Sequence, residues 1–226
     1  MNEILLIGIW ALITIAVSAF AGVLGKKFGV EYTVAILAAL SVMASIFANK
    51  IVLVGPFTVP AGVLVFSMTF VITDIISEAW GKQAAKRAVW TGFYANIILI
   101  LSVFIVINWP SPDFFLEAAT GFNQAIGLTV RIALAGLITY LISQHHDVWA
   151  FHFWKEKTNG KHLWLRNNAS TISSQLIDSV LFITIAFYGV MPILPLIIGQ
   201  WVVKICIALL ETPFVYLTLW LMKKVK

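Results

Sequence analysis

Seven apolar stretches, each long enough to cross the hydrocarbon core of a bilayer as a helix, account for most of this 226-residue chain. They cover residues 4–24, 33–54, 60–80, 88–109, 123–143, 171–190 and 196–222. Hydrophobic residues make up 61% of the chain and charged residues only 11%, whereas a soluble domain carries roughly 25% charged residues. We therefore expect an all-α, multi-pass membrane protein with seven spans.

The basic residues between these stretches alternate regularly. The connectors after the first, third and fifth stretches contain Lys or Arg, as does the C-terminal tail, whereas the other three connectors contain neither. Because basic loops stay on the cytoplasmic side, we expect an outside N-terminus and a cytoplasmic C-terminus in the cell (inner) membrane. Orientation also explains the net charge of +5 without a nucleic-acid partner. Segment 144–170 is expected to be a cytoplasmic connector, whose aromatic part, 147–157, lies along the membrane interface.

Besides Lys50 near the end of the second span, six charged residues lie inside the predicted spans, where an ionised side chain is costly. They are Asp74, Glu78, Arg131, Asp178, Lys204 and Glu211. A charge near the bilayer centre costs about 2.5–3.5 kcal/mol on insertion scales, so these side chains are expected to face one another or a wet cavity. Two interpretations stay open at this point: a cavity for a polar ligand, or internal salt bridges that hold the bundle together.

Spacing places several polar side chains on common helix faces. Asp74 and Glu78 are four residues apart and therefore share one face. Carboxylates, amides and aromatic rings in one cavity suit a flat polar heterocycle, because carboxylates accept its N–H groups, amides bond its carbonyl and rings stack on its faces. The residues alone indicate only a polar solute with hydrogen-bond donors. Further polar candidates within the spans are Thr171, Gln175 and Asp178 on one stripe, and the amides Asn49 and Asn96.

The segment TFVITDIISEAWGK, residues 69–82, resembles the Asp-centred signature of the queuosine precursor transporters, also called the YhhQ or vitamin-uptake-like transporter family. The resemblance extends over about residues 34–226, and its motifs are specific in combination. The other matching motifs are Asn49-Lys50, Val130-Arg131-Ile132-Ala133, segment 144–157, Asn168-Ala169-Ser170-Thr171 with Gln175 and Asp178, and Lys204 with Pro213.

The resemblance implies import of a queuosine precursor (7-cyano-7-deazaguanine, 7-aminomethyl-7-deazaguanine or queuine) that the cell uses to modify transfer RNA. It implies one transmembrane domain, 1–226, with a six-helix core at 33–226 similar to the substrate-binding subunit of energy-coupling-factor transporters, and an extra N-terminal helix at 1–25. It also implies that the protein works without a coupling ATPase module. The expected substrate contacts are the acids Asp74 and Asp178, the amides Gln175 and Asn49, Arg131 or Lys204 as donor or counter-charge, and, with less support, Asn96 and Glu78.

An intramembrane enzyme is the main alternative from another class. His145, His146 and His152, with Asp147 and His162, suggest a metal site, but adjacent histidines cannot easily both reach one ion, and neither HExxH nor GxSxG occurs. We expect interfacial anchoring instead, with no metal, cofactor or catalytic residue. Import of another small polar heterocycle or vitamin, including a role as a substrate-binding subunit, also stays open. Small residues in the first two spans fit helix packing or a homodimer, and without a GxxxxGK[ST] loop the chain itself hydrolyses no nucleotide.

Overall fold

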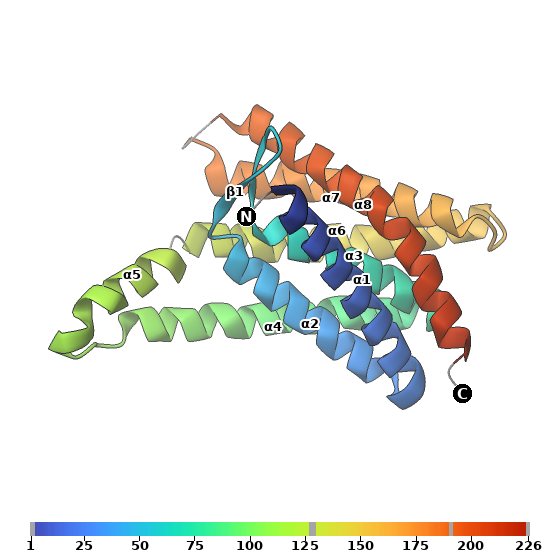
Figure 1. The fold of residues 1–226 in the computed structure, drawn as a ribbon, viewed down its shortest axis with the longest axis horizontal. Coiled ribbons are helices and arrows are strands. Elements are labelled where there is room, and N and C mark those ends of the chain that lie inside the picture. Colours follow the sequence, from blue (N-terminus) through green and yellow to red (C-terminus); the bar gives the residue numbers. More distant parts are fainter. Residues whose placement is uncertain (1–2, 127–129, 190–191, 225–226) are drawn as a thin grey trace.

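The computed structural model describes residues 3–126, 130–189 and 192–224, which form a bundle of long helices (Figure 1). A two-stranded antiparallel hairpin pairs Ile51 with Pro60 and Val54 with Phe57. The helices are α1 (Glu3–Phe28), α2 (Val30–Phe47), α3 (Gly62–Ala79), α4 (Lys82–Asn108), α5 (Leu116–Ile126), α6 (Val130–Lys157), α7 (Leu163–Phe187) and α8 (Ile193–Lys224); the strands are β1 (Ile51–Val54) and β2 (Phe57–Pro60), and a 3₁₀ turn, η1, covers Asp113–Phe115.

Helix α3 lies at the centre of the bundle. Of its 18 residues, 13 are buried, and it packs against α1, α2, α4, α6 and α8. The most extensive contact between two elements is that of α6 with α7, which form an antiparallel pair. Helix α1 packs against α8, α2 and α3 and is thus part of the bundle. The side chains available for an internal site therefore come mainly from α3 and its neighbours.

Six helices in the described part of the chain are long and apolar enough to cross a membrane. They are α1 from Gly8 onwards, α2, α3, α4, α7 and α8. These helices make the chain a multi-pass membrane protein. Helix α6 has 28 residues and is long enough as well, but its polar C-terminal half excludes it from that set.

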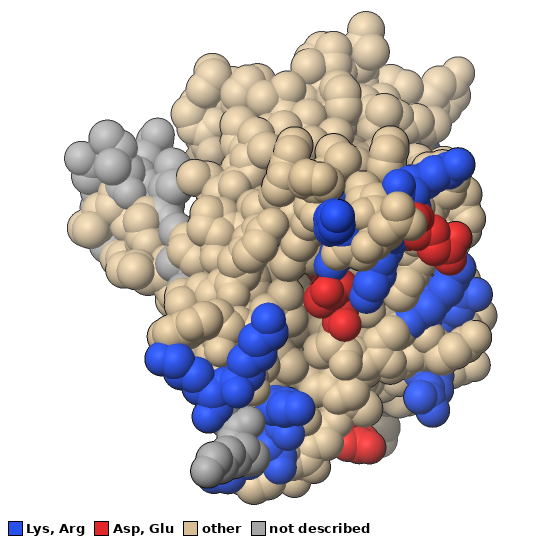
Figure 2. Space-filling model, turned by 90° about the vertical axis from the view of Figure 1, so that its right-hand side faces the viewer, with Lys and Arg blue, Asp and Glu red and all other residues tan. Residues whose placement is uncertain are grey.

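The basic connectors lie together at one end of the bundle. The α1–α2, α3–α4 and α6–α7 connections and the end of α8 point to the right in Figure 1, whereas the hairpin, α5 and the start of α8 lie to the left. Viewed from that right-hand end, Lys and Arg side chains cover much of the surface (Figure 2). We call this the basic end of the molecule, and the other the hairpin end.

The predicted fifth span, 123–143, is wrong as a single helix. Its first residues belong to α5, which has no buried residue, and residues 127–129 lie outside the described parts of the chain. Helix α6 begins at Val130 and continues well past Ser143 to Lys157. The second span is also too long, because α2 ends at Phe47 and residues 51–54 form β1.

The predicted connector 144–170 is wrong too, since most of it forms the adjoining ends of α6 and α7. Segment 147–157 is the C-terminal part of α6, with one face buried in the bundle at Asp147, Val148 and Phe151 and with Trp149 and Phe153 exposed. Some polar side chains here find partners inside the protein, as Asn168 does by donating to the carbonyl of Trp164 and to Thr212. Their polarity therefore reflects a polar interior rather than contact with water.

Candidate functional site

A pocket near the hairpin end is lined mainly by residues of α2, α3, α6, α7 and α8. Its cavity volume is about 60 Å³, well below the roughly 300–1,000 Å³ typical of small-molecule sites, so the pocket is narrow in this structure. Most of its lining is apolar and includes two phenylalanine rings, while an ion pair, an amide and several hydroxyls supply the polar groups. The lining residues are Ser41, Ala44, Ser45, Ala48, Pro60, Gly62, Val63, Phe66, Gly136, Thr139, Tyr140, Asp178, Phe182, Gln200 and Lys204.

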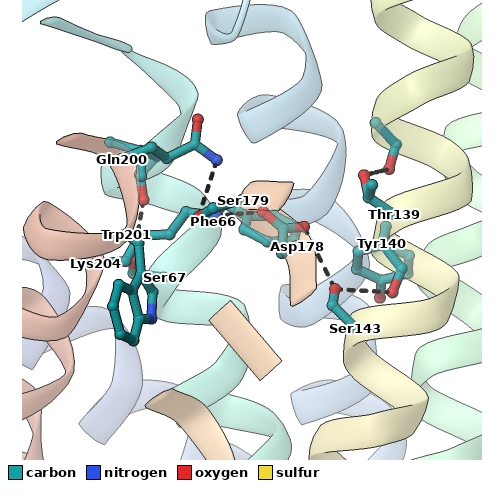
Figure 3. Close-up of polar contacts among 12 residues, drawn as sticks. Phe66, Ser67, Thr139, Tyr140, Ser143, Asp178, Ser179, Gln200, Trp201 and Lys204 are labelled. Carbon is teal, nitrogen blue, oxygen red and sulfur yellow. Dashed lines mark hydrogen bonds and ion pairs between the residues drawn. The ribbon is translucent and has the colours of Figure 1, made fainter. Parts of the chain in front are cut away.

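A buried ion pair between Asp178 of α7 and Lys204 of α8 forms the polar wall of the pocket (Figure 3). The ammonium group of Lys204 contacts Oδ2 of Asp178, and the Ser143 hydroxyl lies 3.4 Å from Oδ1 of the same carboxylate. The Lys204 Nζ also lies 5.1 Å from the centre of the Phe66 ring, an attractive cation–π distance. This wall therefore offers a ligand both an acceptor and a donor while remaining neutral overall.

Two further polar groups of the pocket have unused hydrogen-bonding capacity. The amide of Gln200 donates to Ser179 Oγ at 3.5 Å, but its oxygen has no partner within the described chain, and neither does the hydroxyl of Tyr140. Both side chains are almost completely buried, where an unmade hydrogen bond costs about 1–3 kcal/mol. A bound polar solute would satisfy these groups. The sequence analysis missed both, although Gln200 precedes Lys204 by one helical turn in an apolar segment.

Asn96 does not line the pocket but hydrogen-bonds to two serines that do. Its amide donates to Ser41 Oγ at 2.6 Å and to the carbonyl of Gly92, and its oxygen accepts from Ser45. Ser41 and Ser45 belong to the pocket wall on α2, whereas Asn96 lies on α4. Asn96 thus fixes two pocket hydroxyls and links two helices.

Asp74 and Gln175 are buried but lie outside the pocket, on its basic-end side. Thr171 Oγ1 lies 3.5 Å from Oδ2 of Asp74. Oδ1 of Asp74 and both polar atoms of the Gln175 side chain have no hydrogen-bond partner in the described chain. Asp74 and Gln175 are thus buried polar groups with capacity left for a ligand or an ion.

These two residues belong to a continuous band of buried polar side chains between the pocket and the basic end, which we call the inner polar stripe. Helices α3 and α6 are joined across it by Gln144, which donates to Thr69 at 2.7 Å and accepts from Thr73 at 3.1 Å. The stripe consists of Thr69, Thr73, Asp74 and Ser77 on α3, Ser143, Gln144 and Asp147 on α6, and Ser170, Thr171, Ser174, Gln175 and Asp178 on α7.

Asn49 and Arg131, both expected to contact substrate, are engaged elsewhere. The amide of Asn49 donates to backbone carbonyls of its own chain segment, those of Ser45 and Ile46. Arg131 is exposed, and its guanidinium donates to the carbonyls of Ile185 and Tyr188 at the end of α7. Arg131 therefore caps a helix C-terminus, where a cation is favourable, and neither residue lines the pocket.

Glu78 forms ion pairs at the basic end, with Lys155 at 2.9 Å and Arg166 at 2.7 Å. It is far from a substrate contact, since the inner polar stripe separates it from the pocket. We expect Glu78→Gln to leave the substrate affinity within about twofold of the wild type and to lower stability by about 1–3 kcal/mol, because the buried guanidinium of Arg166 loses its counter-charge. Substrate titration by isothermal calorimetry tests this. A loss of affinity beyond tenfold would contradict this placement of Glu78.

The histidines considered for a metal site point to different partners. His145 Nδ1 lies 2.9 Å from the carbonyl of Leu141, and His146 Nδ1 lies 2.9 Å from Ser174 Oγ. The ring of His152 packs against Phe151.

A pocket with a buried ion pair in its wall, within a bundle of membrane-spanning helices, is typical of membrane proteins that bind and move a small solute. Residues 60–218 match the family model described as "Putative vitamin uptake transporter". The match covers well over half of the chain, and the chain belongs to this family. It is therefore a transporter, and the enzyme alternative is wrong.

Three curated relatives carry related names. A "Probable queuosine precursor transporter" of Bacillus subtilis is 29% identical over 182 residues, which cover 78% of each chain. The "Queuosine precursor transporter" of Escherichia coli is 26% identical over 130 residues, 56% of this chain and 54% of its own. A "Probable queuosine precursor transporter" of Haemophilus influenzae is 24% identical over 127 residues, 56% of this chain and 51% of its own. No solved structure matches the chain.

Proposed function

We propose that this protein imports queuosine precursors, 7-deazaguanine bases used for transfer-RNA modification. The observation that carries the proposal is the similarity to three relatives named as transporters of queuosine precursors. The lining of the pocket supports it independently, because its mixture of aromatic and polar groups suits a flat polar base; the pocket must widen to admit one.

The polar wall matches the hydrogen-bonding edge of a deazaguanine. Such a base presents a ring N–H and an exocyclic amino group side by side, which the carboxylate of Asp178 accepts, and a carbonyl, to which Lys204 donates. The free oxygen of Gln200 accepts a further N–H group. Phe66 and Phe182 supply apolar surface for the faces of the ring. In this arrangement Asp178 and Lys204 are the principal substrate contacts, and Gln200 and Tyr140 replace Asn49 and Arg131.

The same polar groups supply selectivity. A base that lacks the N–H groups leaves the spare accepting capacity of the Asp178 carboxylate and the oxygen of Gln200 unused in a buried site. Sites built to bond a polar group reject an analogue lacking it strongly, by up to about 10⁴–10⁵-fold. We therefore propose that adenine, which lacks both the ring N–H and the carbonyl at this edge, is excluded.

The membrane arrangement proposed here has seven crossings: the six helices α1, α2, α3, α4, α7 and α8, and α6 in addition. The protein lies in the inner membrane with its N-terminus outside. The basic end faces the cytoplasm, because basic residues favour that side (Figure 2). The pocket then lies in the outer half of the bundle, and the inner polar stripe is the route to the cytoplasm. The six-helix part, 33–226, takes the role of the substrate-binding subunit of energy-coupling-factor transporters, without a coupling ATPase; a homodimer is compatible with this arrangement.

Uptake in cells that cannot make queuosine precursors tests the proposed function. Cells that produce the protein and receive nanomolar 7-cyano-7-deazaguanine, 7-aminomethyl-7-deazaguanine or queuine should regain queuosine in their transfer RNA, whereas cells with an empty vector should not. Purified protein should gain thermal stability with the preferred base by at least about 2.7 kcal/mol at 100 times the Kd, and none with adenine. If no base of this series restores the modification or stabilises the protein, another small heterocycle or a vitamin is the substrate.

A further inference from the structure

Asp147 was not among the expected site residues, yet its carboxyl group is fully buried next to that of Asp74. Asp147 lies on α6 with 0% of its surface exposed, and Asp74 lies on α3 with 1% exposed. The two carboxyl groups are within hydrogen-bonding reach of each other. Two carboxylates so close together repel strongly where water is excluded. The pair is therefore stable only if a positive charge compensates it.

No cationic side chain of the described chain forms an ion pair with either acid. Arg166 of α7 is the cation that acts on Asp74, but its guanidinium is held by Glu78 at 2.7 Å and by the carbonyl of Gly160 at 2.6 Å. Lys204 of α8 is paired with Asp178.

The other titratable groups of the packed helices do not supply the charge either. His146 of α6 bonds the Ser174 hydroxyl and not Asp147. Glu211 of α8 is a further buried acid. Arg166 is shared with Glu78, so we infer that further positive charge is bound by the pair itself.

Thr171 donates to Oδ2 of Asp74 at 3.5 Å, but two other hydroxyl groups close to the pair point to backbone carbonyls. Ser170 donates to the carbonyl of Asn167, and Ser174 donates to the carbonyl of Ser170. No hydrogen bond to either oxygen of Asp147 is formed in the described chain. Buried polar atoms are rarely left in this state, and a bond between the two carboxyl groups would satisfy one oxygen of each. A bond between two carboxyl groups requires a proton on one of them.

We propose that Asp74 and Asp147 form a proton-binding site that holds one shared proton while the inner half of the bundle is closed. The pair joins α3 to α6 within the inner polar stripe, the route to the cytoplasm proposed above. A substrate that leaves along this stripe must separate the two helices, which breaks the shared bond and exposes both acids to water. The closed form thus binds one proton more than the open form. This inference rests on the proposed route, and not on the identity of the substrate.

The proton itself can be detected by infrared spectroscopy of the purified protein in lipid vesicles at neutral pH. The wild type should show a protonated carboxyl band that the Asp74→Asn/Asp147→Asn variant lacks. Glu211→Gln, which changes another buried acid, is the matched control and should keep that band. If the double variant and the wild type have the same carboxyl bands, both acids are ionised and the proposal is overturned.

The link to opening is tested with a reporter thiol. Ser77 is completely buried on the basic-end side of Asp74, so Ser77→Cys, in a Cys206→Ser background that removes the exposed native thiol, reports on opening of the stripe. The rate of maleimide labelling is divided by the rate for the unfolded protein at the same pH, which removes the pH dependence of the thiol itself. This ratio should rise by up to about tenfold per pH unit, the slope expected when opening releases one proton. Adding Asp147→Asn should make labelling slow and independent of pH, whereas adding Glu211→Gln should leave the slope unchanged.

Each other outcome of the labelling experiment counts against the proposal. A pH slope that survives Asp147→Asn would assign the effect to another group. Labelling that depends on sodium at constant pH would identify a metal ion, rather than a proton, as the occupant. Neither readout uses a queuosine precursor, so a failed uptake assay with intact pH-dependent labelling would reject the proposed substrate and retain the proton site.

Discussion

Lys204→Met is expected to lower the free energy of unfolding by about 3–5 kcal/mol and to abolish uptake. The substitution leaves the buried carboxylate of Asp178 without its counter-charge, and the loss of one partner of a buried pair has this effect in other proteins. It also removes the donor that the substrate carbonyl requires. Thermal unfolding in detergent and radiolabelled uptake in vesicles measure the two effects.

The double variant Asp178→Leu/Lys204→Met separates stability from binding. It contains no unpaired buried charge, so most of the lost stability should return, because apolar replacement of a buried ion pair is often neutral or stabilising. Uptake should remain absent, since neither the acceptor nor the donor of the polar wall is present. Wild-type uptake by this double variant would contradict the assignment and make the ion pair a purely structural feature.

Gly62→Ala is expected to be the most damaging small substitution in the pocket. A Cβ at this position would overlap the carbonyl oxygen of Ala44 and approach the Ala48 nitrogen to 2.9 Å. Both are backbone atoms of the α2 end, which cannot rotate away, so α2 and α3 must separate where they form the pocket wall. We expect a loss of about 1–3 kcal/mol in stability and at least tenfold weaker substrate binding, measured by thermal unfolding and calorimetry.

Gly136→Ala is the matched control in the same pocket. A Cβ there would meet only the Phe182 ring at 3.9 Å, an ordinary van der Waals contact. Stability and affinity should both stay close to the wild-type values. Equal effects of the two substitutions would show that added volume in the pocket, and not the close approach of α2 to α3, determines the result.

The sequence predicted the charged side chains of the pocket better than its uncharged polar side chains. Asp178 and Lys204 could be identified because a charge within an apolar helix needs a partner, and the two are indeed paired. Asn49 and Arg131 satisfied the same criterion, but a backbone carbonyl is also an adequate partner, and both residues bond carbonyls. Periodicity gives the face of a helix on which a residue lies, but not the neighbouring helix that this face meets.

The helix boundaries show the same limitation. Helices α3 and α8 were located to within three residues at both ends, since a membrane-spanning helix must be predominantly apolar, whereas α2 ends seven residues before the predicted span. The polar halves of α6 and α7 were read as a loop because a buried polar interior and a water-exposed connector have similar compositions. Asp147 was missed for this reason: it lies in an aromatic and basic stretch that resembled an interfacial segment.

The polarity of α6 has a consequence for how the protein is made. With Gln144, Asp147 and three histidines in its sequence, α6 gains little from entering lipid alone, whereas α7 is apolar enough to do so. The two helices share the most extensive contact in the bundle, through which α6 finds polar partners. We therefore expect α6 to remain outside the hydrocarbon until the ribosome has synthesised α7, and the two to be inserted together as a helical hairpin. Biogenesis then depends on the same polar surfaces that make up the transport route.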